Sequence, residues 1–496
     1  MDKLAPRIGL AAVLLWMTFW YWHAQHYWED DAYIHLEYAR SVFKGHGFMF
    51  NGRLSNGDTS PLWVLLLAAT HLVSPDWLLS GKVLSVAGGL FSVAMAWAFA
   101  QRLADDTGSA SPTIVPVLVG LYVLSPFFCI WVFSGMEAIA AAGLVMLQAL
   151  LLVPQRPRAA TFFGATLALG VGPLVRPELG LMIVAGGPFL LRQWLSVTQG
   201  ASTGRRATWF GLAAALLALP LALWAWYAIT EFGHVTPHTN AAKRAMPNEP
   251  VLTRMVSVFG LGFPGVLLGL GLSVALLVPS PMRVRVQTAT RTVPLVAWPL
   301  LLWCLATLVF YVVNHTYVQT RYVAVLAPGL MLVLLLAVRA RAKPGIFTGT
   351  VVLTAVLELG ISLLMSYPSV RNKALVQEAT AAFVKDIQQL VAPDEPIAIY
   401  AIGQVAFLIR NPLVDIGGVT QPAAIPYLYK DTAEMARWAQ SQGARHYVWG
   451  QAPLPGAIRL AQMDTMESGW FFKHSKYQES SPSYLWRLPA PTASPQ

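Results

Sequence analysis

Long apolar runs divide the first 366 residues of this chain. A membrane-spanning helix needs about 20 consecutive apolar residues, and a chain that is 56% hydrophobic and 12% charged supplies such runs repeatedly. Soluble domains carry about 25% charged residues. The sequence therefore predicts an all-α polytopic membrane domain of eleven spans, at residues 8–22, 80–101, 112–132, 138–153, 159–175, 179–194, 208–229, 256–278, 293–313, 322–338 and 346–366.

The first apolar run could also belong to a secretory signal peptide, because Lys3 and Arg7 precede it. The stretch that follows, HAQHYWED, is bulky and polar where a signal peptide has small residues at its cleavage site. We therefore expect a retained anchor helix.

The distribution of positive charge predicts the orientation of the spans. If the N-terminus is cytoplasmic, the cytoplasmic segments are rich in basic residues and hold only the acids Asp2, Asp105 and Asp106, whereas the opposite loops have mixed sign. The basic residues of the cytoplasmic segments are Lys3, Arg7, Arg102, Arg156, Arg158, Arg192, Arg205, Arg206, Arg283, Arg285, Arg291, Arg339, Arg341 and Lys343. The net charge of +10 thus indicates orientation, and no nucleic-acid partner is expected.

One apolar run breaks the alternation. Residues 62–73 are too few to span comfortably, and a span there would move the later arginine clusters to the outside. We interpret this run as a helix in the outer interface, inside a first outer loop at 23–79, which suits Trp63 and His71. A tilted true span is the alternative.

Residues 367–488 have the composition of a soluble domain and, after eleven spans, would follow on the outer side. An amphipathic pattern at 431–442 predicts a helix, and residues 397–401 and 446–450 predict short buried strands. Alternation of helices and strands favours a small α/β domain. We expect residues 489–496 to be disordered.

Five predicted outer loops share unusual polar residues close to the bilayer edge, at 29–31, 134–137, 176–178, 231–244 and 314–322. A charged residue so close to hydrocarbon needs a partner or a function. Acids mixed with Arg and Lys on one face suit a site that holds an anionic head group beside a reactive carboxylate.

Transfer of a sugar from a lipid-linked phosphate would use such a set of side chains. Positive charge grows on the sugar and negative charge on the leaving phosphate, so the first needs a carboxylate and the second needs Arg or Lys. The hydroxyl group that accepts the sugar needs a general base, for which Asp or Glu serves.

The first outer loop, EDDAYIHLEYARSVFKGHGFMFNGRLSNGDTSPLW, resembles that of GT-C membrane glycosyltransferases that use polyprenyl-phosphate sugars, and is most similar to the mycobacterial-type arabinofuranosyltransferase group. SGME, RPE, GHVTPHTNAAK and TRY resemble later landmarks, and YAIGQVAFLIRNPLVDIGGVTQP resembles the outer C-terminal domain. The resemblance implies a bacterial inner-membrane enzyme with its active site and C-terminal domain on the periplasmic side. Its partners would be a polyprenyl-phosphate sugar donor, with arabinofuranose as a candidate sugar, a glycan, lipid or protein acceptor, and membrane lipids.

The chain departs from the pattern of this group at three places. His238 stands where relatives often have Asn, Glu37 replaces the usual Arg, and Asp58 replaces Tyr in Gly-Tyr-Thr. The identities of the sugar and the acceptor therefore stay open.

Asp30 and Asp31 are the strongest catalytic candidates. Their structural alternative is to cap and solvate the start of a helix at 32–43. Neighbouring helical residues point about 100° apart, so we expect one aspartate to act as base while the other orients the loop. The resemblance favours Asp30 as base.

Other residues are candidates for contacts with the donor or its phosphate. Each has a structural alternative: a helix N-terminus for Glu137, snorkelling for Arg176, an interface cation for Lys243 and an aromatic belt for Tyr322. Arg321 opens a span on the outer side, where the positive-inside trend does not predict Arg. The donor-contact set is Arg176, Glu178, His238, Asn240, Lys243, Arg321 and Tyr322, with Glu137 as an additional candidate.

The sequence gives little sign of a metal or a disulfide. Cys129 and Cys304 both lie inside apolar runs, and His26, His46 and His71 do not have a metal-ligand spacing. No cofactor is predicted with certainty, and a divalent cation at the acidic loop stays open. Glu358 lies inside a predicted span with no assigned role beyond a contact with another helix.

Two other functions compete with glycosyl transfer. A transporter or flippase of lipid-linked sugars would typically show internal repeats and ionisable residues at mid-membrane, whereas here these residues gather toward one face. A scaffold or sensor that binds partners through its C-terminal domain is the third alternative.

Overall fold

Helices make up most of the chain, and a small mixed sheet lies in its C-terminal part. The computed structural model describes residues 4–106, 114–244, 250–263, 265–267, 293–339, 344–428, 430–463 and 483–490. The chain divides into two compact units. The first comprises Met1–His23, Ser85–Ala225 and Pro250–Tyr367, and the second Ala24–Leu84, Trp226–Glu249 and Pro368–Gln496.

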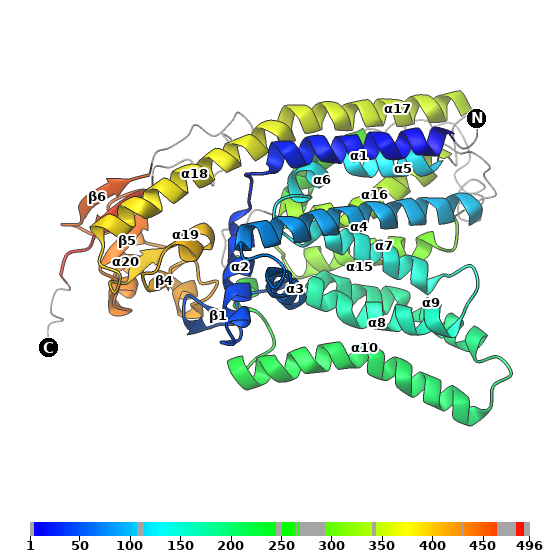
Figure 1. Cartoon of the computed structure of the whole chain (residues 1–496), viewed down its shortest axis with the longest axis horizontal. Helices are drawn as coiled ribbons and strands as arrows, with labels where there is room; N and C mark the ends of the chain where they lie inside the picture. Colours follow the sequence, from blue (N-terminus) through cyan, green and yellow to red (C-terminus); the bar gives the residue numbers. More distant parts are fainter. Residues whose placement is uncertain are drawn as a thin grey trace. The chain divides into compact units, whose positions relative to one another are not determined.

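Apolar helices account for the first unit, where α7, α8, α9, α15 and α16 run side by side (Figure 1). The helices that form or enter this unit are α1 (Leu4–Ala24), α4 (Trp77–Asp106), α5 (Ile114–Leu124), α6 (Pro126–Trp131), α7 (Ala138–Leu152), α8 (Ala159–Val175), η1 (Pro177–Gly180), α9 (Leu181–Val197), α10 (Thr203–Phe232), α12 (Val251–Gly262), α15 (Ala297–Val313), α16 (Thr320–Arg339), α17 (Pro344–Ile361) and the π-helical turn η2 (Ser362–Ser366).

These helices coincide with the apolar runs of the sequence. Four stretches are long and apolar enough to cross a membrane by length and composition: Trp77–Asp106, Pro177–Val197, Thr203–Phe232 and Gly349–Leu390. The others are shorter apolar helices. The predicted polytopic helical character is confirmed, and the number of spans stays a prediction.

Two glycines let neighbouring helices approach closely. A Cβ added to Gly170 of α8 would lie 2.4 Å from the carbonyl oxygen of Leu217 in α10, and one added to Gly143 of α7 would lie 2.8 Å from Cα of Ser92 in α4. Small residues at such crossings are typical of membrane helices, whose association depends on close van der Waals packing.

The prediction of one helix at 112–132 is wrong, because the chain breaks between α5 and α6. Pro126 lacks an N–H group and disfavours a helical conformation at Ser125. Ser125 caps the new helix by accepting a hydrogen bond from the amide of Phe128. Ser362 and Ser366 donate hydrogen bonds to the carbonyl oxygens of Leu124 and Pro126, at 2.6 and 3.0 Å.

A second interruption follows α12, and it gives Glu358 a structural role. The predicted span at 256–278 lies partly outside the described residues. Within them, α12 ends at Gly262, and Glu358 Oε1 accepts a hydrogen bond from the amide of Val266 at 3.1 Å. This carboxyl group therefore satisfies a backbone donor where a neighbouring helix is interrupted. The predicted cations at 283–291 and 341–343 also lie outside the described part.

The second unit contains a five-stranded sheet in the order β4-β3-β5-β7-β6. Strands β4, β3 and β5 are parallel, whereas β7 pairs antiparallel with both β5 and β6. The elements of this part are α18 (Tyr367–Leu390), β3 (Ile397–Ile399), α19 (Gly403–Leu408), β4 (Leu413–Asp415), η3 (Pro422–Tyr427), α20 (Thr432–Ser441), β5 (His446–Trp449), β6 (Ile458–Gln462) and β7 (Tyr484–Arg487). The predicted strands near 397 and 446 and the predicted helix near 431 are confirmed.

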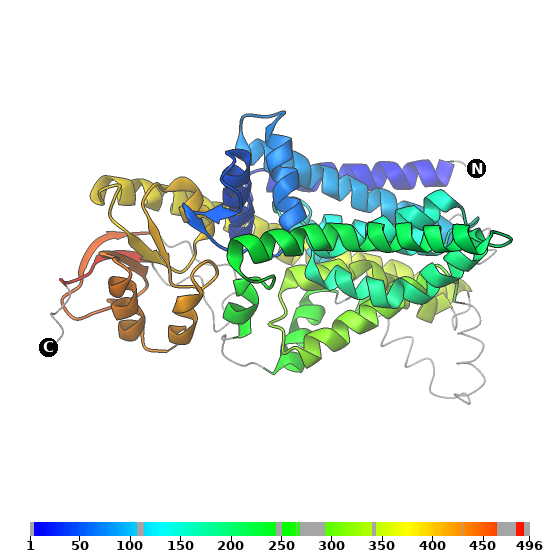
Figure 2. The ribbon, with the colours of Figure 1, turned by 90° about the horizontal axis from the view of Figure 1, so that it is seen from below.

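Alternate residues of the strands face opposite layers. The sheet lies between α18 and the pair α20 and η3, as Figures 1 and 2 show. Ala398 and Tyr447 belong to a buried cluster with Met435 and Trp438 of α20. This core holds the α/β part of the unit together.

The predicted first outer loop forms the remainder of the second unit, together with α11 (His238–Arg244). It contains α2 (Asp30–Phe43), the hairpin β1 (Met49–Phe50) and β2 (Arg53–Leu54), and α3 (Pro61–His71). We had expected this loop within a membrane domain at 1–366, yet it groups with residues 368–496. Helix α3 is the short apolar helix expected at the interface, and it exposes Leu65 and Leu66.

Cysteine labelling tests the predicted orientation. Single cysteines at Thr236 and His315, which are both exposed, should react with a membrane-impermeant maleimide added to intact spheroplasts. Cysteines at Gln155 and Thr203, also exposed, should react only after the membrane is opened. The opposite labelling pattern would contradict the predicted orientation and, with it, the prediction of a site on the outer side. Cys129 and Cys304 are buried, and replacing both with serine gives the background protein.

Candidate functional site

Asp30 and Asp31 lie in the first turn of α2, so the helix begins two residues earlier than expected. Glu29 is the N-cap residue; its backbone is extended, and its side chain makes no capping hydrogen bond. Asp30 and Asp31 are therefore helical residues, and neither occupies the N-cap position. Negative charge in a first turn still suits the helix dipole.

The carboxylate of Asp30 is bound by backbone amides of the C-terminal part. The amide of Gln404 donates to Oδ1 at 2.8 Å, and the amide of Gly403 donates to Oδ2 at 3.2 Å. Part of the residue stays exposed, while burial of its carboxyl group raises the pKa of Asp30 to about 7. The two amides oppose this rise, and the charges of Asp31 and Glu29 add to it.

Glu29 has different surroundings. Its Oε2 pairs with Nζ of Lys373 in α18 and accepts a hydrogen bond from the hydroxyl of Tyr27 at 2.8 Å. Glu29 therefore ties the start of α2 to α18. Asp31 is half-buried in the same turn.

A buried histidine–aspartate pair, which we did not predict, lies further along the loop. His35 Nδ1 lies 2.5 Å from Asp58 Oδ2, and the amide of Ser60 donates to Asp58 Oδ1 at 2.6 Å. Asp58 is one of the departures from the arabinofuranosyltransferase pattern, and this departure is the only sequence signal for the pair. The contact fixes the loop that follows the hairpin onto α2.

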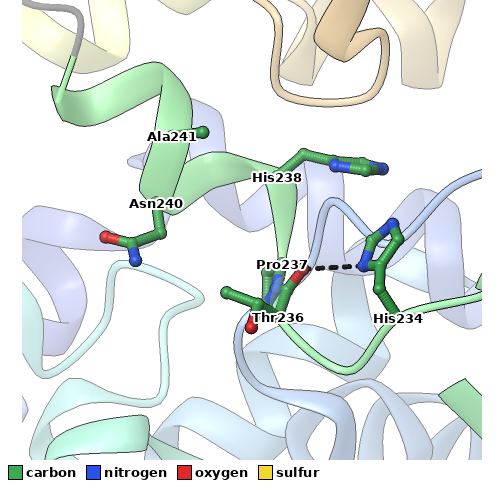
Figure 3. Close-up of a pocket in the computed structure, with 6 residues that line it drawn as sticks. All are labelled: His234, Thr236, Pro237, His238, Asn240 and Ala241. Carbon is green, nitrogen blue, oxygen red and sulfur yellow. Dashed lines mark hydrogen bonds between the residues drawn. The ribbon is translucent and has the colours of Figure 1, made fainter. Parts of the chain in front are cut away.

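His238 and Asn240 line a pocket of about 520 Å³ with His234, Thr236, Pro237 and Ala241 (Figure 3). The pocket is open to solvent, and Figure 3 shows the His238 and Asn240 side chains directed away from each other. His234 Nδ1 donates to the carbonyl oxygen of Thr236 at 2.9 Å. Burial, and secondly His234, lower the pKa of His238. The predicted contact of Lys243 lies outside the described residues, because only the backbone of Lys243 is described.

In the first unit, Arg176 joins two buried glutamates. Its Nη1 lies 2.6 Å from Glu137 Oε1, and its Nε lies 2.7 Å from Glu178 Oε1. Burial acts to lower the pKa of Arg176, but Glu178 and Glu137 outweigh burial and raise it, so the guanidinium stays charged. Arg176, Glu178 and Glu137, all donor-contact candidates, thus bind one another.

Aromatic residues complete the surroundings of this cluster. Trp303 donates to the carbonyl oxygen of Glu178 at 3.0 Å, and the hydroxyl of Tyr311 donates to its Oε1 at 3.4 Å. The ring centroid of Tyr322 lies 5.1 Å from the guanidinium carbon of Arg176 and 5.6 Å from that of Arg321. Arg321 is itself buried. Two cations thus lie near the ring of Tyr322, and one of them, Arg176, binds two carboxylates.

The predicted site residues therefore fall into separate groups. Glu137, Arg176, Glu178, Arg321 and Tyr322 gather in the first unit. Asp30 and Asp31 share a turn of α2 in the second unit, where His238 and Asn240 share α11 and one pocket. Among the residues that the structure describes, no three His, Cys, Asp or Glu side chains could together hold a metal ion.

Comparison with known proteins yields structural relatives only, since no family model and no curated protein sequence matches the chain. ArnT from Cupriavidus metallidurans bound to undecaprenyl phosphate has a TM-score of 0.60 at 13% identity, over the whole of both chains. Its apo form has a TM-score of 0.59 at 14% identity, over 100% of this chain and 99% of the other. The apo oligosaccharyltransferase of Archaeoglobus fulgidus has a TM-score of 0.51 at 11% identity, over 89% of this chain and 69% of the other.

At such identities the likeness shows the fold. The chain shares its fold with ArnT and with the archaeal oligosaccharyltransferase.

Removing Arg176 tests whether it holds the buried cluster of the first unit together. Arg176→Ala leaves two buried carboxylates without their counter-ion, and it should lower the free energy of unfolding by about 3–5 kcal/mol. Chemical denaturation in detergent measures this change. The exposed Arg205 provides the matched control, since Arg205→Ala should change the stability little. Equal stability of the two variants would contradict this role of Arg176.

Proposed function

We propose that the protein is a membrane glycosyltransferase that moves a sugar from a polyprenyl-phosphate donor to an acceptor hydroxyl. The half-buried Asp30 carboxyl group, held by the backbone amides of Gly403 and Gln404, carries this proposal, and burial raises its pKa to about 7. A base of that pKa is half ionised at neutral pH and can still accept a proton efficiently. The GT-C fold supports the assignment, because ArnT, which shares that fold, has been crystallised with undecaprenyl phosphate.

In the proposed reaction, Asp30 accepts the proton of the acceptor hydroxyl as its oxygen attacks the anomeric carbon. The bond from that carbon to the phosphate oxygen breaks, and polyprenyl phosphate leaves with the electron pair. Asp31 supports the turn that presents Asp30. The two amides bound to Asp30 hold its carboxylate while each oxygen keeps a second lone pair for the acceptor.

We assign the leaving phosphate to the cationic side chains. Arg321 and Lys243 would bind its oxygens, with Tyr322, His238 and Asn240 as further donor contacts. Arg176 already has two carboxylate partners. We therefore propose that Arg176, Glu178 and Glu137 shape the donor site chiefly by fixing the segment between α8 and α9.

The finer identity of the substrates rests on the resemblance of the first outer loop. That resemblance favours arabinofuranose as the sugar, and a glycan, lipid or protein as the acceptor. The reaction would take place at the outer face of a bacterial inner membrane, with the N-terminus in the cytoplasm.

Asp30→Asn tests the base directly. Asn still offers one oxygen to the amide of Gln404 but cannot take a proton, so the variant should bind donor and lose transfer by ~10²–10⁴-fold. Asp31→Asn and Glu29→Gln should lose less. The assay measures polyprenyl phosphate released from undecaprenyl-phosphate arabinofuranose, with host membranes as the acceptor source. Near-normal transfer by both aspartate variants would show that neither Asp30 nor Asp31 is the general base.

Arg321→Ala and Lys243→Ala test the phosphate contact. Leaving-group charge grows in the transition state, so each change should slow transfer by ~10²–10³-fold. Arg321→Lys should rescue only in part, because Lys cannot form a bidentate contact. Single-turnover kinetics with the donor measure the effect, and unchanged rates in all three variants would exclude these residues from the site.

A further inference from the structure

We infer that the C-terminal segment completes the catalytic centre, because the backbone amides of Gly403 and Gln404 position the Asp30 carboxylate for proton transfer. The inference rests on the proposed function, in which Asp30 is the base. It assigns Gly403 and Gln404 as positioning residues, since they act through Asp30.

The two amides are the natural donors at this place. Helix α19 begins at Gly403, and the first N–H groups of a helix have no partner within the helix. One amide binds each oxygen of Asp30, at 2.8 and 3.2 Å. A carboxyl group held at both oxygens cannot rotate freely, so its remaining lone pairs keep a fixed direction.

Position 403 has no room for a side chain. A Cβ added to Gly403 would lie 2.0 Å from the backbone oxygen of Asp30 and 2.6 Å from its Cγ. Neither atom is the far end of a flexible side chain, so the backbones would have to move apart. Glycine at 403 is therefore a requirement of the contact with Asp30.

Helix α18 holds both partners of this contact. Gln377 Oε1 accepts from the amide of Trp28 at 2.9 Å, and the carbonyl oxygen of Gln377 accepts from Nε2 of Gln404 at 2.9 Å. Hydrogen bonds thus connect residue 28 to 377, 377 to 404 and 404 to Asp30, and the backbone from 28 to 30 closes the path. The ion pair of Lys373 with Glu29 adds a second tie.

The Gln404→Pro and Gln404→Ala variants form a matched pair. Both lose the side-chain bond to Gln377, but only proline loses the amide that binds Asp30. Proline fits the first turn of a helix, where its missing N–H group is not needed. The difference between the two variants therefore reports the backbone hydrogen bond.

The pH dependence of transfer distinguishes positioning from general damage. An amide that binds the charged carboxylate favours ionisation, so its loss should raise the pKa of the base. In Gln404→Pro the acidic limb of kcat/KM should move up by about one pH unit relative to Gln404→Ala, which gives a loss of about tenfold at pH 6 and little loss at pH 9. The other titratable groups around Asp30 are Glu29, with its partner Lys373, Asp31 and Tyr33, and both variants leave them unchanged.

Gly403→Ala provides a second test if the proline variant fails to fold. It should reduce transfer by about tenfold or more at neutral pH, shift the acidic limb in the same direction and leave donor binding unchanged. Gly211→Ala in α10, where an added Cβ meets nothing within 4 Å, is the control and should transfer normally.

The outcomes separate this inference from the proposed function. If Asp30→Asn abolishes transfer while Gln404→Pro and Gly403→Ala keep the pH profiles of their controls, the positioning role is wrong and the base remains. A loss of equal size at every pH, with the acidic limb unshifted, contradicts the binding of the charged Asp30 carboxylate by these amides. If Asp30→Asn itself transfers normally, the proposed function fails first.

Discussion

A peptide group inside hydrocarbon must find its hydrogen-bond partner within the protein, and this constraint orders the first unit. Most of its backbone is helical. Where a helix is interrupted within the described residues, side chains form hydrogen bonds with the backbone groups that the helix leaves unpaired. Ser125, Ser362 and Ser366 bind the chain around Pro126, and Glu358 binds it after α12. Glu358, which lies in a predicted span, therefore has a structural explanation that does not require a transport pathway.

The second unit depends on a different interaction, the binding of α2 to the C-terminal part. Short loops with two-residue strands have little core of their own, so their order must come from partners. Arg40 donates to the carbonyl oxygen of Phe407, Asn51 Oδ1 accepts from the amide of Leu413, and Ser55 donates to the carbonyl oxygen of Thr420. These contacts join a segment before residue 84 to one after residue 400. A functional site that includes the first outer loop therefore depends on the folding of the segment after residue 400.

The predictions that succeeded concern local properties. The hydropathy of the sequence predicted the bounds of α7 and α8 almost to the residue. A membrane helix is a continuous apolar run, and such a run can be seen in the segment's own residues without knowledge of its partners. The break before Pro126 was missed because an apolar run hides a single proline. The partners of Asp30 could not be predicted, since Gly403 is ordinary in sequence and its contact is more than 370 residues away. Arg176 and Glu178 are close in sequence, whereas their partner Glu137 comes from the N-cap of another helix and could not be assigned to them from the sequence.

Three consecutive carboxylates at the start of α2 thus have three different surroundings. Glu29 is neutralised by Lys373 and anchors the turn to α18. Among the described residues, the carboxylate of Asp30 is bound by two backbone amides and by no cation; burial and its acidic neighbours raise its pKa, and the amides oppose this rise. Asp31, about 100° further round the helix, adds to that rise. A salt bridge at Asp30 would lower its pKa and weaken it as a base, so neutral amide donors are the partners that fix its position while keeping it able to accept a proton near pH 7.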